Sequence, residues 1–160
     1  TTPWTLLANQ AIVYNRSNLD YCRVKINNET YLVARQRLDY LSRELGQPLD
    51  VLDTISIDDL AAIRYLDCNR VVRVLGEASF VTNDIGTGFV HVAPAYGFDD
   101  FTWYSQRLTE GYTNLSPLLE IVDEQGNFID KMVPSPLKGK NIFSPDVIKF
   151  LDEKSMLLLT

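Results

Sequence analysis

Hydrophobic and polar residues alternate with a period of two near the start of the chain, and this alternation predicts a β-hairpin. Between residues 21 and 26 every second residue is apolar (Cys22, Val24 and Ile26), which is the pattern of a half-buried strand. The pair Asn27-Asn28 is typical of a tight turn, and residues 30–34 supply the returning strand. We therefore expect a hairpin over residues 20–34.

Other short apolar runs and a few helical patterns complete the expected elements. Strands are expected over residues 10–15, around 71–74, and over 78–81, 89–92 and 118–122. Helices are expected over residues 35–45 and 99–110, for one or two turns within 58–64, and from a Ser144 N-cap with Pro145 at the first helical position. Residues 1–8 are expected to be extended or turn-like, because Pro3 lies near their start.

Short strands dominate this pattern, and the helices lie between or after them. The chain contains neither βαβ alternation nor a G-x-G-x-x-G or P-loop motif. The predicted fold class is therefore mainly β with peripheral helices, arranged as a closed or partly closed β-barrel. The length of 160 residues favours a single domain over residues 1–160.

One stretch, residues 86–101, carries the candidate chemistry and the only histidine of the chain. It is expected to form a buried strand that ends before Pro94, a turn, and the start of a helix. His91 lies in the strand, and Asp99 and Asp100 lie where the helix begins. His91 and Asp100 can therefore face one pocket. The alternative is purely structural: a hydrogen-bonded histidine and a pair of carboxylates that cap the helix.

Composition narrows the possible functions. The net charge of −6 argues against a domain that grips a long stretch of nucleic acid through its phosphates, although a pocket for one nucleotide end is compatible with it. No apolar run approaches the ~20 residues that span a bilayer, and no segment of the given sequence resembles a signal peptide. Cys22 and Cys68 have no metal-ligand spacing, so we expect reduced packing residues, a cytoplasmic protein and no metal site.

Both ends of the chain lead to an expectation about its origin. The sequence starts at Thr1-Thr2-Pro3-Trp4 without an initiator methionine and ends in the hydrophobic run 157–159. We expect a fragment of a larger protein.

Few residues remain as candidates for catalysis. The chain has no G-x-S-x-G elbow, and its two cysteines lie in strand-like or loop contexts that do not indicate an activated thiol. What remains is a pocket of threonine hydroxyls, one histidine and one aspartate. Such a pocket can hold an ammonium group, position a water molecule and select a side chain by its shape.

Two separated stretches resemble motifs of the isoleucyl-tRNA synthetases. Residues 1–9, TTPWTLLAN, resemble the family's threonine-rich segment T-T-P-W-T-L-P-A-N, with Leu7 in place of proline. Residues 86–100 resemble the motif G-T-G-x-V-H-x-A-P-x-x-G-x-x-D. Residues 122–126 and 137–140 are similar to the family's downstream V-D-x-x-G and G-K segments. The resemblance covers nearly the whole chain.

In that family these segments build the editing domain, an insertion in the catalytic domain. The resemblance implies the barrel fold shared by the isoleucyl, valyl and leucyl enzymes and hydrolysis of valine mischarged onto isoleucine tRNA, after transfer and possibly also as valyl-adenylate. One methylene distinguishes the two amino acids, and this synthetase is the standard example of the weak discrimination that a single hydrophobic pocket achieves. The ATP-site motifs H-I-G-H and K-M-S-K-S are absent, so the fragment is not expected to aminoacylate tRNA.

The resemblance also implies a role for each matching residue. Asp100 would bind the α-ammonium group of the substrate and is the expected catalytic residue. Thr1 and Thr2 would line the amino-acid pocket, with Thr2 as the steric wall against isoleucine. Asn9 would order the loop or bind the terminal adenosine, and His91 would face the side-chain pocket and set specificity. The nucleophile would be a water molecule held between these groups and the free ribose hydroxyl.

The expected partners follow from the same resemblance. They are the 3′ end of isoleucine tRNA charged with valine and the rest of the parent synthetase in cis. The protein is expected to be a monomer, without a cofactor, a metal or a membrane association.

Structural roles are expected for Trp4 and Thr5, and Lys138 and Lys140 are expected to be solvated or to touch the tRNA end. The alternative function is a non-catalytic β-barrel module that binds the tRNA acceptor end or spaces the domains of a class I synthetase.

Overall fold

The computed structural model describes residues 2–67, 70–129 and 133–156. The described residues form two compact units. Unit 1 contains the residues up to Gln10, those of Leu66–Val71, and those from Val92 onward, and unit 2 contains Ala11–Tyr65 and Val72–His91. The single domain expected over residues 1–160 stays a prediction.

Unit 2 contains the predicted hairpin as part of a three-stranded antiparallel sheet. Strand β2 (Tyr21–Ile26) lies between β3 (Glu29–Ala34) and β4 (Asp50–Ile55). Asn27 and Asn28 form the turn with φ angles of 48° and 71°, the left-handed values that a two-residue hairpin turn requires. The hairpin prediction is confirmed.

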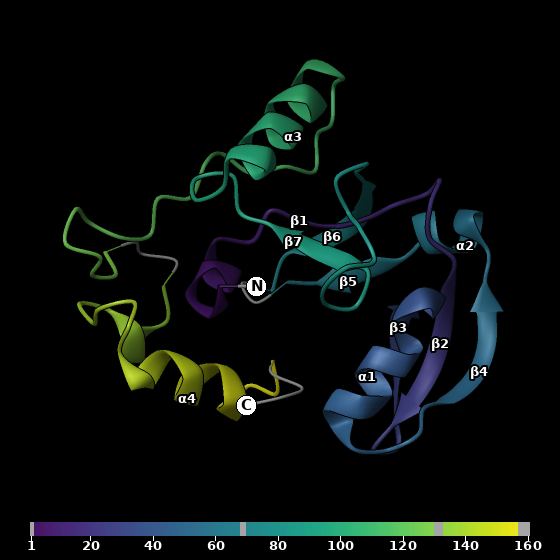
Figure 1. Cartoon of the computed structure of the whole chain (residues 1–160). Helices are drawn as coiled ribbons and strands as arrows, with labels where there is room; N and C mark the ends of the chain where they lie inside the picture. The colour runs from purple at the N-terminus through teal and green to yellow at the C-terminus, as the bar shows by residue number, and fades with distance from the viewer. Residues whose placement is uncertain (1, 68–69, 130–132, 157–160) are drawn as a thin grey trace. The chain divides into compact units, whose positions relative to one another are not determined.

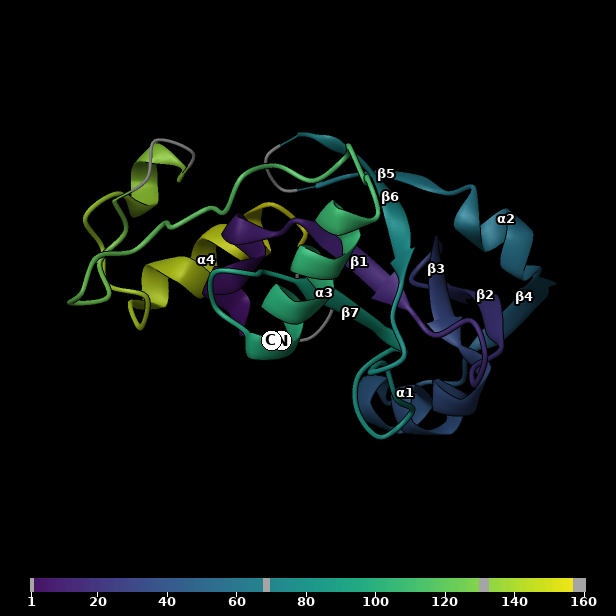
Figure 2. The same ribbon diagram turned by 90° about the horizontal axis from the view of Figure 1, so that it is seen from above.

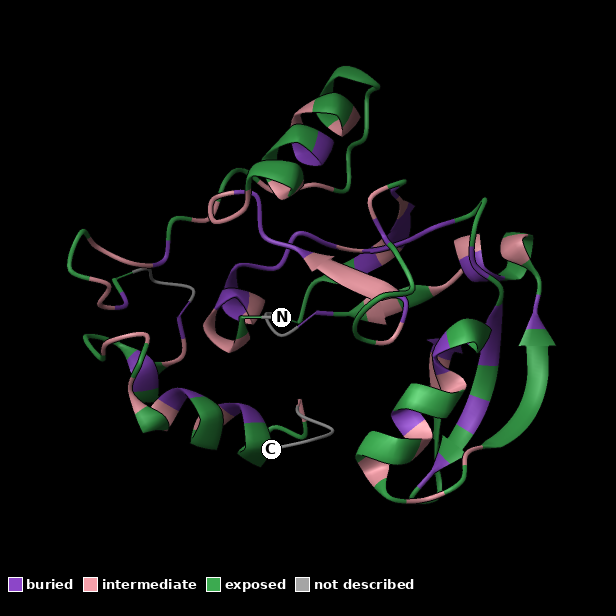
Figure 3. Ribbon diagram, in the orientation of Figure 1, coloured by how far each residue is buried: buried purple, intermediate pink, exposed green. Residues whose placement is uncertain are grey.

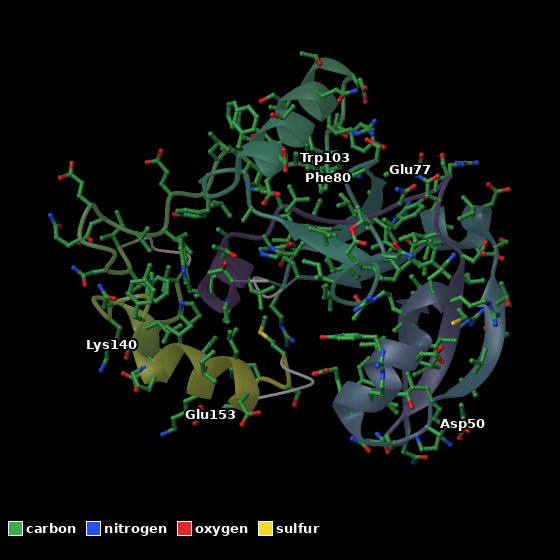
Figure 4. All side chains as sticks on the ribbon, viewed as in Figure 1. Asp50, Glu77, Phe80, Trp103, Lys140 and Glu153 are labelled. Carbon is green, nitrogen blue, oxygen red and sulfur yellow. The ribbon has the colours of Figure 1, made fainter. Side chains whose placement is uncertain are left out.

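Strand β4 was not predicted, and its exposure explains why. Its first five residues are exposed, so no alternation of buried and exposed positions marks it (Figure 3). Figure 4 labels Asp50 at its start. The strand forms because β2 offers its second edge, which is a tertiary effect that a local pattern does not contain.

A helix covers one face of this sheet. The short 3₁₀ helix η2 (Arg35–Arg37) leads into α1 (Leu38–Leu45), which confirms the helix predicted over residues 35–45. Figure 1 shows α1 lying across β2 and β3. The buried core between them consists of Cys22, Val24, Ile26, Val33 and Leu41. Cys22 is a free, buried thiol as expected, whereas Cys68 lies outside the described residues.

The second sheet has four strands in the order β5-β6-β1-β7. Their bounds are β1 (Ala11–Tyr14), β5 (Arg64–Leu66), β6 (Val72–Glu77) and β7 (Phe89–Val92), and the short helix α2 (Ile57–Ala61) precedes β5. Strands β1 and β6 lie side by side (Figure 2) and run parallel, with Ile12 opposite Leu75. The predicted strand over 89–92 is confirmed with the same bounds.

The strand predicted over residues 78–81 is wrong, and a side chain explains the difference. The amide of Ala78 still donates to the carbonyl of Tyr14, at 2.9 Å. Beyond it, the side-chain amide of Asn15 donates to the carbonyls of Ser79 (3.3 Å) and Val81 (2.8 Å). These backbone groups are therefore satisfied by one asparagine, so no partner strand is required.

Unit 1 consists of helices and loops around its own core. Its helices are η1 (Pro3–Ala8), α3 (Phe98–Thr109), η3 (Ser135–Leu137) and α4 (Pro145–Glu153). The buried core residues are Leu7, Ala8, Ala93, Ile121, Phe128, Val133, Leu137, Val147 and Leu151. The helix predicted from Ser144 is confirmed, and the Ser144 hydroxyl accepts a hydrogen bond from the amide of Asp146.

Two predictions for unit 1 are corrected. Residues 3–8 form a 3₁₀ helix where an extended or turn-like segment was expected, with Pro3 in its first turn, where a missing N–H costs nothing. Residues 118–122 form no strand; a single bridge joins Val122 to Phe128. Asp123 organises the loop between them by accepting from the amides of Gln125 (3.0 Å) and Asn127 (2.8 Å).

The fold class is therefore mixed, with two sheets and a few helices, rather than mainly β. Among the described residues the strands form two sheets instead of one closed ring. None of the helices in the described part of the chain has the length and apolar character needed to cross a membrane.

Candidate functional site

Asp100 lies in the first turn of α3 and is bound to the backbone just after β7. The amide of Ala93 donates to Oδ2 of Asp100 at 2.8 Å. The carbonyl of Ala93 accepts from the amide of Tyr96 at 2.9 Å, which closes the turn after Pro94. The backbone of one residue, Ala93, thus fixes both the turn and the carboxylate.

Gly97 makes room for that carboxylate. It is the N-cap of α3, and a β-carbon on it would lie 2.9 Å from both Cγ and Oδ2 of Asp100. Such a distance is shorter than van der Waals contact, so any other residue would displace the carboxylate. Gly97 was not predicted as a site residue, although its place three residues before Asp100 in the motif was a signal.

The electrostatics of Asp100 are unusual for a helix N-terminus. Burial raises the pKa of this carboxyl above its ordinary value of 3.8, the hydrogen bond from Ala93 opposes the rise, and the neighbouring Asp99 adds to it. Asp100 is partly buried, and no cation among the described residues pairs with it. A nearby cation would favour the ionised form of such a carboxyl.

Thr2 is the N-cap residue of η1 and is exposed. Its carbonyl accepts from the amide of Thr5 at 3.1 Å and from the Thr5 hydroxyl at 2.8 Å. Thr5 itself is buried, so the geometry agrees with its structural role. Thr1, the other predicted threonine, lies outside the described residues.

Asn9 ends η1 and is only 4% exposed. The next residue, Gln10, donates its amide to the carbonyl of Val92 at 2.8 Å. The Gln10 side chain also donates to the carbonyl of Pro117 (3.0 Å) and accepts from the amide of Ser116 (3.0 Å). Because Val92 precedes the residue that binds Asp100, these bonds place Asn9 close to the Asp100 anchor.

Side-chain packing joins the same two segments. The rings of Trp4 and Tyr96 meet edge to face, with centroids 4.7 Å apart. Leu7, Ala8 and Ala93 belong to one buried core. The structure therefore brings the segment that carries Thr2 and Asn9 together with Asp100 inside unit 1, and Trp4 packs in the core region as expected.

His91 is the last residue of unit 2, so the group formed in unit 1 does not include it. It lies in β7 and is partly buried. Burial lowers its pKa from 6.5 to about 4. His91 is therefore a neutral imidazole at pH 7, which suits a wall against an apolar side chain better than a charged group does.

The predicted lysines lie in the segment that joins η3 to α4. Lys140 pairs with Asp146 in the first turn of that helix at 2.9 Å, and Figure 4 shows Lys140 at one end of α4 and Glu153 at the other. Lys138 is exposed. Among the residues that the structure describes, no cluster of His, Cys, Asp or Glu is arranged to hold a metal ion.

The sequence is similar to segments of isoleucine–tRNA ligases. It is 36% identical over 162 residues to isoleucine–tRNA ligase 2 of Bacillus anthracis, a match that covers 98% of this chain and 15% of that protein. It is 33% identical over 160 residues to the isoleucine–tRNA ligase of Thermoplasma acidophilum, with 99% and 15% covered. The chain thus spans about one seventh of the length of these relatives. No protein-family model matches it.

Two crystal structures have a similar fold. The structure of GlLeuRS-CP1 superposes with a TM-score of 0.75 at 15% identity, over 99% of this chain and 80% of that one. The editing domain of the P. falciparum cytosolic leucyl-tRNA synthetase gives 0.53 at 13% identity, over 96% and 58%.

Proposed function

We propose, because this chain matches the editing (CP1) domain of an isoleucyl-tRNA synthetase, that it hydrolyses the ester of valine mischarged onto isoleucine tRNA. Homology to a synthetase editing domain supports a deacylase in general. The specific substrate is our proposal.

One observation carries this proposal: the partly buried Asp100 carboxylate, which is held by the Ala93 amide and has no cationic partner among the described residues. An aminoacyl ester presents a free α-ammonium group as its only cation. The carboxylate binds that ammonium and thereby fixes the ester carbonyl relative to the rest of the pocket. The hydrogen bond to Ala93 occupies Oδ2 and leaves Oδ1 for the substrate.

In the proposed reaction a water molecule attacks the ester carbonyl carbon. The bond from that carbon to the ribose oxygen breaks, the water oxygen remains on the released valine, and a proton passes to the ribose oxygen. The free neighbouring hydroxyl of the terminal ribose and the pocket groups hold the water. The reaction as proposed uses no metal, cofactor or covalent intermediate.

Selection of valine over isoleucine is assigned to shape. Thr2, the N-cap residue of η1, is the proposed wall that excludes the extra methylene, and the neutral His91 is proposed to set specificity for the amino-acid side chain. Thr1 is proposed to line the same pocket. The buried position of Asn9 supports its role in ordering the loop over direct binding of the terminal adenosine.

The proposed partners are the acceptor end of isoleucine tRNA and the rest of a parent synthetase in cis. The small part of each relative that the chain matches supports a domain that works within a longer enzyme. We propose a cytoplasmic monomer that does not aminoacylate tRNA by itself, and a partly closed barrel remains part of this proposal.

Deacylation of mischarged tRNA tests the function. Valyl-tRNA(Ile) and isoleucyl-tRNA(Ile) are incubated with the wild-type chain and with three variants: Asp100→Asn, Thr2→Ala and Asp99→Asn. Wild type is expected to release valine and spare isoleucine, and Asp100→Asn is expected to release neither. Thr2→Ala is expected to release both. Asp99→Asn is the matched control, because it changes an exposed carboxylate in the same helical turn.

The outcome also decides between this function and the non-catalytic module. A wild-type chain that binds the tRNA acceptor end but releases no amino acid would favour the module. Full activity in Asp100→Asn would contradict the role of that carboxylate.

A further inference from the structure

Arg37 is a buried cation in unit 2 that binds backbone carbonyls of a loop far away in sequence. It ends η2 and is 7% exposed. Its Nε donates to the carbonyl of Gly86 at 2.9 Å, and its Nη1 donates to the carbonyls of Asn83 (2.7 Å) and Asp84 (3.1 Å). Its guanidinium also stacks on the ring of Tyr40, 4.1 Å from the centroid.

The hairpin formed by β2 and β3 binds the next two residues of that loop, Thr87 and Gly88. The amide of Ala34 donates to the carbonyl of Thr87 at 2.7 Å, and the hydroxyl of Tyr21 donates to the carbonyl of Gly88 at 2.9 Å. Gly88 lies so close to β3 that a β-carbon on it would be 2.3 Å from Cβ of Ala34. Loop 83–88 is therefore bound through five of its six carbonyls.

This loop leads directly into β7, the strand of His91. Among the described strands, β7 lies at an edge of the four-stranded sheet, next to β1. An edge strand has one row of ladder hydrogen bonds to hold it. The anchors at residues 83–88 therefore make a large contribution to where β7 begins and to how it is oriented.

The chemistry at this position requires an arginine. Burying a cation is costly unless its donors are hydrogen-bonded, and no carboxylate among the described residues pairs with Arg37. Its planar fork reaches carbonyls on three different residues at once, which a lysine ammonium does with much less geometric definition. The printed hydrogen bonds of Arg37 all go to loop carbonyls, which gives its guanidinium a positional role that an apolar residue cannot replace.

We propose that Arg37 is a positioning residue: it fixes loop 83–88 and through that loop sets the placement of His91 in β7. Only the expected effect on catalysis rests on the proposed function, because it assumes that His91 sets amino-acid specificity. The placement of the loop is independent of that function and is tested separately.

The variants are Arg37→Met, which keeps the length of the side chain without its donors, and Arg37→Lys, which keeps the charge. Arg43→Met is the matched control, because Arg43 lies on the exposed face of α1 and its Nε donates to the carbonyl of Asp39 in the same helix. Hydrogen exchange of the Ala34 amide reports on its bond to Thr87. Exchange of the Val24 amide, in the β2–β3 pairing, reports on the hairpin itself.

In Arg37→Met we expect Ala34 to exchange at least about tenfold faster while Val24 is unchanged. We expect kcat for valyl-tRNA(Ile) to fall by about 100-fold, the loss typical of a misplacement of about 1 Å, with a smaller change in KM. The ratio of valine to isoleucine release should also fall. Arg37→Lys should lie between wild type and Arg37→Met, and Arg43→Met should match wild type.

Wild-type exchange at Ala34 in Arg37→Met would refute the fixing of the loop. Faster exchange with unchanged discrimination would refute the effect on His91. If Arg37→Met does not fold, Arg37→Lys decides by the same two measurements. A wild-type chain that hydrolyses neither ester would overturn the proposed function, and the exchange data would still decide whether Arg37 holds the loop.

Discussion

The amide of Ala93 and the carboxylate of Asp100 are joined by a 2.8 Å hydrogen bond. This bond links the residue after β7 to the first turn of α3, so the end of the strand determines where the carboxylate lies. Burial raises the pKa of that carboxylate, and only the ionised form binds an ammonium group. The geometry and the charge of this pair lead to the first two predictions.

Asp100→Asn should separate activity from stability. The amide oxygen of asparagine can still accept from Ala93, so the fold is expected to remain. Because the folded pKa of Asp100 is above its unfolded value, its ionised form weakens the folded state at neutral pH, and the variant should be at least as stable as wild type at pH 7. Loss of the charge should raise the activation free energy of deacylation by about 2 to 5 kcal/mol.

Urea unfolding and deacylation kinetics check both parts. In wild type, kcat/KM should rise with pH through a pKa above 3.8, and this limb should be absent in Asp100→Asn. A variant that is markedly less stable than wild type at pH 7 would show that the carboxylate serves the fold instead.

Gly97→Ala should impair activity through Asp100. The backbone of Gly97 has φ −140°, which alanine adopts without strain, so the effect should come from the β-carbon 2.9 Å from the Asp100 carboxyl. We expect a loss of about tenfold or more in kcat/KM, because small displacements of a positioned group are costly. Thermal unfolding should change little.

A double-mutant cycle identifies the cause. If Gly97→Ala acts by moving the carboxylate, it should have no further effect on the residual activity of Asp100→Asn. Additive losses would mean that Gly97 serves the turn rather than the carboxylate.

His91 should make stability depend on pH. Its folded pKa of about 4 lies below the ordinary value of 6.5, so the unfolded chain binds more protons between these values. Stability from this residue is fully present above pH 6.5 and is lost as pH falls towards 4. Between pH 7 and pH 4.5 the loss should be about 2 kcal/mol.

Urea unfolding at the two pH values, in wild type and His91→Gln, isolates this contribution. The difference in unfolding free energy between wild type and His91→Gln should shrink or reverse at pH 4.5. An identical pH dependence in both would place the titration of His91 near its ordinary value.

Gly88→Ala should be more destabilising than Gly86→Ala. Both glycines have positive φ, +85° and +68°, so alanine is strained by about 1 kcal/mol or more at either position. Only Gly88 also meets Cβ of Ala34, at 2.3 Å, whereas Gly86 faces open space. The collision should add about 1–3 kcal/mol, measured as the difference in unfolding free energy between the two variants.

An equal decrease in unfolding free energy in Gly88→Ala and Gly86→Ala would mean that the loop moves away from β3 without cost. That result would also weaken the case that Arg37 holds the loop in one place.

The sequence by itself determined the elements whose causes are local. The hairpin over residues 20–34 follows from its alternation and from two asparagines that tolerate the turn. The strand over residues 89–92, the turn at Pro94 and the carboxylates at the start of α3 also follow from neighbouring residues, since proline and helix ends act over a few positions. The motifs indicated the candidate residues Thr2, Asn9, His91 and Asp100 in the same way.

Tertiary structure alone decided which of these elements meet. Strand β4 forms on an edge of β2, and β1 pairs in parallel with β6, more than fifty residues away. Segment 78–81 is held by the side chain of Asn15 and so forms no strand. The physical reason is that each of these contacts depends on groups supplied from a distant part of the chain, such as the Arg37 donors 46 to 49 residues before their acceptors. Local periodicity carries no record of such partners.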